Sequence, residues 1–89
     1  MAKKIALITR HRQAEAMRMA LGLTLLEDEA EVFILQDLLD DDATANQLRQ
    51  CQSVDLPVYC TAQGPAGLPY LDLAEAAQRW TQFDRLVTL

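Results

Sequence analysis

The sequence predicts an α/β domain built on a mostly parallel sheet. Four short apolar runs, which we expect to be strands, alternate with three stretches rich in helix-forming residues, so the element order is βαβαβαβ. Strands joined through helices run parallel, with right-handed crossovers. The chain has 89 residues, and we expect one small three-layer domain over residues 1–89.

The first half of the chain predicts two interior strands with a helix between them. The strands are KKIALIT at 3–9 and AEVFILQ at 30–36, both apolar enough at the centre to be buried on both faces. Residues 13–27 are dominated by Ala, Met and Leu and carry two apolar stripes. An ordinary surface helix has one stripe of about 100°. We therefore expect one face of this helix on the sheet and part of the other on a partner subunit.

The second half of the chain repeats the alternation. A helix is expected at about 43–51, followed by the strand LPVYC at 56–60, whose proline lies near the start, where a missing N–H is tolerated. The segment DLAE at 72–75 predicts a capping box that opens the last helix. The final strand is FDRLVTL at 83–89.

Composition and charge exclude several classes of partner. The net charge is -5 with only 8 Lys and Arg, so we expect no nucleic-acid partner. Only five largely apolar residues separate the N-terminal lysines from Arg10, fewer than the roughly 7–15 of a signal peptide. No apolar run approaches the roughly 18 residues of a membrane span, so we expect a cytoplasmic protein with no membrane contact. Hydrophobic residues make up 51%, more than a small core can hide, so we expect a homo- or hetero-oligomer. Only three glycines are present, without a dinucleotide or Walker motif, and no cofactor is expected.

The candidate site lies at the carboxyl edge of the sheet, where open α/β sheets place their chemistry. Cys60 ends the third predicted strand, just before a glycine-bearing loop at 61–67. If strands one and three are neighbours, as in flavodoxin-like sheets, then Arg10, His11 and Arg12 lie beside Cys60. Nearby cations lower the pKa of a thiol from about 8.5 to between about 3.5 and 7.5. This juxtaposition predicts an exposed, reactive Cys60 thiolate stabilised by the three basic residues.

Structural explanations compete with this chemistry. Free cysteines are among the most buried residue types, so Cys60 could equally be a core residue, and Cys51 is expected to be structural. The two cysteines lack a C-x-x-C spacing and should be free thiols in a reducing cytosol. His11 could simply be exposed, and the two arginines could pair with carboxylates. The run at 40–42, DDD, precedes a helix, and capping explains it without a metal.

Several of these features together resemble a known family. They are the alanine-rich first helix, EVFILQD at 31–37, LPVYC ending in Cys60, the glycine-bearing loop and the final FDRLVTL. This pattern resembles the DsrE/DsrF/DsrH superfamily, which includes the TusB, TusC and TusD sulfur-relay subunits. The resemblance implies a small oligomeric α/β fold in whose catalytic members a cysteine at the position of Cys60 carries sulfane sulfur as a persulfide. The length and the ILQD stretch look closer to the DsrH/TusB branch, whose members often are architectural subunits.

Three functions are consistent with the sequence. The first is a sulfurtransferase-like relay protein that holds a persulfide on Cys60 and passes sulfur between donor and acceptor proteins. The second is a non-catalytic DsrH/TusB-like structural subunit or binding module of an oligomer. The third is a sensor of a small ligand. The chain departs from the family pattern at two places. AQGPAG at 62–67 stands where the family often has a basic residue followed by glycine, which weakens the case for an anion-stabilising group beside Cys60. EDEA at 27–30 stands where the family has a glycine before the second strand, and this departure bears only on the turn.

Overall fold

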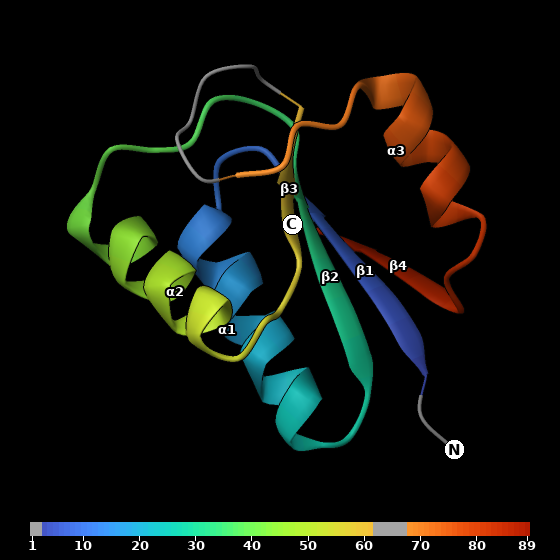
Figure 1. Ribbon diagram of the computed structural model, residues 1–89, viewed down its shortest axis with the longest axis horizontal. Coiled ribbons are helices and arrows are strands. Elements are labelled where there is room, and N and C mark those ends of the chain that lie inside the picture. The colour runs from blue at the N-terminus through green and yellow to red at the C-terminus, as the bar shows by residue number, and fades with distance from the viewer. Residues whose placement is uncertain (1–2, 62–67) are drawn as a thin grey trace.

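The predicted order of elements is present in the structure. Figure 1 shows a computed structural model that describes residues 3–61 and 68–89. The glycine-bearing part of the loop after Cys60, residues 62–67, lies outside the described residues. The elements are β1 (Lys4–Thr9), α1 (Gln13–Leu25), β2 (Glu29–Ile34), α2 (Asp42–Ser53), β3 (Val58–Cys60), α3 (Leu73–Trp80) and β4 (Arg85–Thr88).

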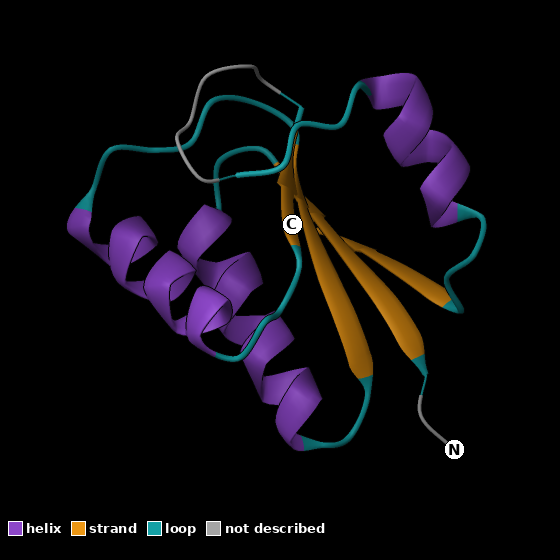
Figure 2. Cartoon of the chain, viewed as in Figure 1, coloured by secondary structure: helices purple, strands orange, loops and turns teal. Residues whose placement is uncertain are grey.

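The four strands form one parallel sheet, and the predicted α/β class with three layers is confirmed. Helices α1 and α2 cover one face of the sheet and α3 covers the other (Figure 2). The strand order is β3-β2-β1-β4, so β2 separates β1 from β3. The expected contact between strands one and three is therefore wrong. The crossovers through α1 and α2 lie on the same face of the sheet, and each moves the chain one strand further in the same direction. The crossover through α3 lies on the opposite face and brings the chain back to the free edge of β1.

The larger apolar core lies between the sheet and the pair α1 and α2. Strand residues alternate between the two faces, and this core takes Leu7 from β1, Val32 and Ile34 from β2 and Val58 from β3. Helix α1 adds Met17, which is fully buried. Burial of these branched side chains is the main stabilising contribution on this face.

An aromatic cluster fills the opposite face, under α3. The ring of Phe33 is 1% exposed and stacks on Tyr59 with ring centroids 5.3 Å apart. Trp80 and Phe83 meet the same ring edge-on at 5.7 and 5.9 Å, distances at which aromatic pairs attract. Strand β2 is thus buried on both faces, which explains its continuous apolar run.

Helix α3 is fixed to the sheet by polar contacts as well. The predicted capping box is present: Asp72 Oδ1 accepts from Glu75 N at 2.8 Å, and Glu75 Oε1 accepts from Asp72 N at 3.4 Å. Near the other end of the helix, the Arg79 guanidinium donates to both carboxylate oxygens of Glu31 on β2, at 2.8 and 3.1 Å. Because this ion pair is bidentate and partly buried, it sets the orientation of α3 on the sheet.

Candidate functional site

Cys60 ends β3 at the carboxyl edge of the sheet, as the sequence predicts, but its sulfur is buried. The residue is 1% exposed and belongs to the core under α1 and α2. Its Sγ donates a hydrogen bond to the carbonyl of Gln36 at 3.1 Å, a bond that uses the thiol proton. The expectation of an exposed sulfur is wrong, because alternation along β3 turns Val58 and Cys60 to the covered face and Tyr59 to the other.

The backbone of Cys60 is held on both sides. On the inner side β3 pairs with β2, with Cys60 opposite Ile34. On the outer side Cys60 N donates to Pro69 O at 3.1 Å, and Cys60 O accepts from Leu71 N at 3.0 Å. The chain after the loop therefore returns alongside β3 and continues the sheet beside the cysteine. Exposing the sulfur requires these contacts to loosen.

The three basic residues lie apart from the thiol. Arg10, His11 and Arg12 are all exposed, and they follow β1, which is two strands and so about 10 Å away from β3. Arg12 pairs with Glu15 at 2.6 Å, one turn along α1. Within residues 3–61 and 68–89, no hydrogen bond or ion pair joins the three residues to Cys60. The predicted cation–thiolate arrangement is therefore not formed.

His11 and Arg12 instead border a shallow pocket of about 380 Å³ between the starts of α1 and α2. Its rim also carries the carboxylates of Glu15 and Asp41, so the cationic groups have acidic neighbours there. Asp41 is the N-cap of α2, with Oδ1 accepting from Thr44 N at 2.7 Å. This hydrogen bond lowers the pKa of Asp41. The capping explanation of the acidic run is confirmed at Asp41.

Gln13 is a residue of this edge that the sequence does not reveal. It is fully buried at the start of α1. Its Nε2 donates to Arg10 O and Asp37 O, both at 3.0 Å, and its Oε1 accepts from Leu39 N at 2.9 Å. One side chain thus joins the loop after β1 to the loop after β2. The bonds have no local sequence signal, since their partners on the second loop are 24 and 26 residues away.

Cys51 is a core residue of α2, consistent with the structural role expected for it. It is fully buried against α1, and desolvation raises the pKa of its thiol to about 11. At neutral pH the thiol is therefore protonated. Both cysteines are free. Among the described residues, no group of three or more His, Cys, Asp or Glu side chains is arranged to hold a metal ion.

A cavity of about 410 Å³ lies at the opposite, amino edge of the sheet. It opens where β2 extends past β3: the ladder starts with Val32 N donating to Pro57 O at 3.0 Å. Pro57 has no N–H, so it cannot donate to the carbonyl of Ala30, the next position of β2 facing this side. A short length of β2 edge therefore borders the cavity.

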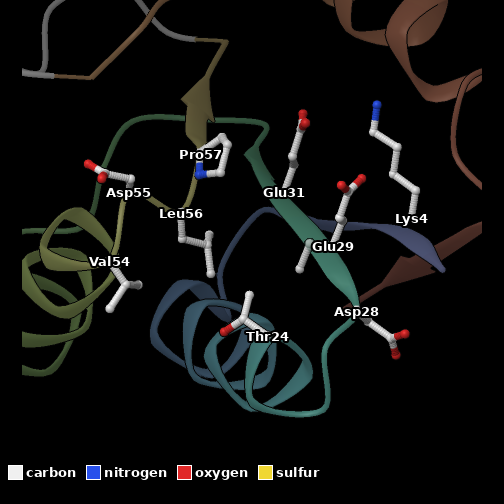
Figure 3. Close-up of a pocket in the computed structure, with 10 residues that line it drawn as sticks. Lys4, Thr24, Asp28, Glu29, Glu31, Val54, Asp55, Leu56 and Pro57 are labelled. Carbon is white, nitrogen blue, oxygen red and sulfur yellow. The ribbon is translucent and has the colours of Figure 1, made fainter. Parts of the chain in front are cut away.

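Figure 3 shows how the side chains around this cavity are divided. Leu56 lies on the α1 side, above Thr24, and contributes apolar surface. Glu29 and Glu31 project from β2 to the opposite side, the same side as Lys4. With a volume in the range of ligand pockets, a partly apolar lining and an open strand edge, the cavity has the properties of a binding surface. Its lining lacks a paired nucleophile and base.

The fold and these sites define a small doubly wound α/β domain with buried thiols and open cavities at both edges of the sheet. Comparison of the chain with protein-family models, with curated proteins and with solved structures finds no match in any of the three. None of the helices in residues 3–61 and 68–89 has the length and apolar character required to cross a bilayer.

Proposed function

We propose that this chain is a non-catalytic subunit or binding module of an oligomeric assembly, the role that the DsrH/TusB-like resemblance also suggests. The observation that carries the proposal is the burial of Cys60, which is 1% exposed with its Sγ donating to Gln36 O at 3.1 Å. The sulfur has neither solvent access nor a cationic neighbour in the described part of the chain.

Persulfide transfer makes two demands that this environment does not meet. A thiolate must approach the outer sulfur of the donor, and a second thiolate must later reach the sulfur that it carries. Reactive cysteines accordingly occupy electropositive, partly exposed surroundings, whereas buried structural cysteines are inert. Cys60 packs in an apolar core instead, with its backbone bonded to Pro69 and Leu71.

The surfaces of the domain suit binding. The cavity at the amino edge of the sheet offers a strand edge and an apolar wall. Met19 and Leu25 on the outer side of α1, and Leu26 just beyond its end, are exposed. Apolar surface of this kind is typical of contacts with other proteins. We propose that the partners are protein subunits and that the protein works in the cytoplasm, where free cysteines are the rule.

A persulfide carrier is the second candidate, favoured by the position of Cys60 at the carboxyl end of a parallel strand. In that case the Cys60 thiolate attacks the outer sulfur of a donor persulfide. The donor S–S bond breaks, the donor leaves as a thiolate, and Cys60–S–SH forms. The reaction requires the sulfur to leave its contact with Gln36.

Intact-mass measurement after incubation with a low-molecular-weight persulfide separates the two candidates. The proposal predicts no one-sulfur gain for the native protein, and gains for the urea-unfolded chain, which serves as the positive control. Cys60→Ser and Cys51→Ser are matched variants that locate any gain. A gain on the native protein that disappears in Cys60→Ser and persists in Cys51→Ser establishes the carrier and refutes the non-catalytic subunit.

A further inference from the structure

We propose that the open edge of β2 at Ala30 binds an extended segment of a partner protein in which an apolar residue adjoins a basic one. The proposal rests on the proposed function as a binding module and names the kind of partner that the module takes. Three features of the amino edge support it: two backbone groups of Ala30 without partners, an apolar wall beside them, and the carboxylate of Glu29 on the other side of the sheet.

The N–H and carbonyl of Ala30 point to the β3 side of β2 and have no hydrogen-bond partner in the described part of the chain. Even-numbered residues of β2 bond in that direction: Val32 N donates to Pro57 O at 3.0 Å, and Thr61 N donates to Ile34 O at 2.9 Å. Odd-numbered residues bond to β1 instead. Ala30 is only 5% exposed, and backbone groups in such surroundings are nearly always paired. An open pair beside a cavity therefore points to a ligand.

The edge is open because of the turn that leads from α2 to β3. Leu56 N donates to Cys51 O at 2.9 Å, so the chain is still tied to the end of α2 at the point where it would have to reach β2. Asp55 has φ 58, the left-handed conformation that turns the chain at helix ends. Pro57 has no N–H to donate. Strand β3 therefore cannot extend to Ala30 without loss of this turn, and the edge is left to another chain.

A strand added at Ala30 meets different surroundings on its two sides. Residues opposite one another in a sheet point to the same face, so the residue opposite Ala30 points toward α1 and α2. There it reaches the cavity of about 410 Å³, where Leu56 lies above Thr24 and favours an apolar side chain (Figure 3). The next residue of the added strand points to the α3 side, toward which Glu29 projects (Figure 3).

The charges on the α3 side favour a basic residue at this second position. The Glu31 carboxylate is already paired with Arg79. The Lys4 amine lies 5.0 Å from the centroid of the Phe83 ring. Glu29 is exposed, and within the described residues no ion pair involves its carboxylate. A lysine or arginine of the added segment supplies that partner.

The same charges disfavour a second copy of the chain and a phosphate-bearing ligand. Antiparallel pairing of two such edges about Ala30 places Glu29 of each copy opposite Glu31 of the other, and like charges directly opposite destabilise a strand pair. Four carboxylates line the cavity against one ammonium, so it repels a phosphate as well: Asp28, Glu29, Glu31 and Asp55. A basic, extended segment that adds to the sheet satisfies both the backbone groups and the charge.

Titration of the isotope-labelled protein with peptides, followed by NMR, tests the proposal. A short blocked peptide of alternating lysine and valine should shift the amide signals of Ala30 and Glu29, with a Kd of about 0.1–1 mM. The same peptide methylated on its backbone nitrogens cannot donate to the Ala30 carbonyl and should bind at least about fivefold more weakly. A peptide with glutamate in place of lysine should leave the Ala30 signal unchanged.

Protein variants and hydrogen exchange supply the controls. Glu29→Lys should raise the Kd of the lysine–valine peptide by about fivefold, because it replaces attraction by repulsion. Asp40→Lys makes the same change in net charge in the exposed loop at the carboxyl edge and should leave Kd within about twofold. In the free protein, the amide hydrogen of Ala30 should exchange at least about tenfold faster than that of Val32, which is bonded to Pro57.

Several results overturn the proposal. They are no shift of Ala30 at about 5 mM peptide, equal binding by the methylated peptide or by Glu29→Lys, and exchange of the Ala30 amide as slow as that of Val32. A shift of Ala30 that depends on protein concentration alone assigns the edge to a second copy and also overturns it. Persulfide uptake by Cys60 is measured separately, so that result alone decides the non-catalytic role.

Discussion

Outside the apolar core, we expect replacement of the Gln13 side chain to reduce the free energy of unfolding more than replacement of any other single side chain. Gln13→Met keeps the length of the side chain and removes all three of its hydrogen bonds, to Arg10 O, Asp37 O and Leu39 N. At about 0.5–1.5 kcal/mol for each bond, the loss is about 3 kcal/mol. A domain of this length has a free energy of unfolding of about 4–13 kcal/mol, so the variant should lose a large part of its stability.

Urea titration followed by circular dichroism measures this loss. A change of about 3 kcal/mol should lower Tm by about 12–24 °C, while the dependence on denaturant stays the same. Gln78→Met, on the exposed side of α3, is the matched control and should change stability by less than about 0.5 kcal/mol. If Gln13→Met is as stable as that control, the three bonds do not hold the two loops together and the reasoning is refuted.

Three further predictions follow from the titrating and ion-paired groups. Arg79→Met should cost about 1.5–3 kcal/mol, because it leaves the Glu31 carboxylate, 11% exposed, without its partner; a double variant that also carries Glu31→Gln should recover part of the loss, and no recovery would contradict the assignment. Burial raises the pKa of Cys51 from 9.0 to about 11, so the unfolded chain releases this proton at a lower pH than the folded one. The stability advantage of the wild type over Cys51→Ala should therefore be constant below pH 9 and shrink as pH rises toward 11, and urea titrations that show a constant difference would exclude this. The lowered pKa of Asp41 has the opposite sign: the advantage of the wild type over Asp41→Ala should be full above the ordinary aspartate pKa and disappear as acid protonates the folded state, whereas an advantage that survives in strong acid would argue against the cap.

Most of the helices and strands could be predicted because short sequence patterns, such as apolar runs and capping residues, determine them. The apolar run around Phe33 reflects burial on both faces of β2, and Asp72 with Glu75 gives the start of α3 within one residue. The order of the strands could not be predicted in this way. The handedness of each crossover is a general rule, but it does not decide whether a helix carries the chain to the left or to the right edge of the sheet.

The candidate site was harder to predict because it depends on contacts between distant segments. The position of Cys60 at the end of a strand follows from the sequence, but whether its side chain faces a helix or solvent depends on which face α1 and α2 cover. Gln13 looks like an ordinary polar residue at a helix start. Its role depends on carbonyl and amide groups of the loop after β2. Leu25 belongs to the apolar sequence of α1 and is nevertheless its most exposed large apolar residue.

The accessibility of the Cys60 thiol in the native protein is the most direct test of the central claim. In a Cys51→Ser background, the rate of alkylation of Cys60 is measured without denaturant and again in concentrated urea at the same pH. If the sulfur reacts only when the chain opens, the native rate should be about 10³-fold or more below the unfolded rate, as the stability of a domain of this size implies. A native rate within about tenfold of the unfolded rate would contradict the buried, non-catalytic role of Cys60.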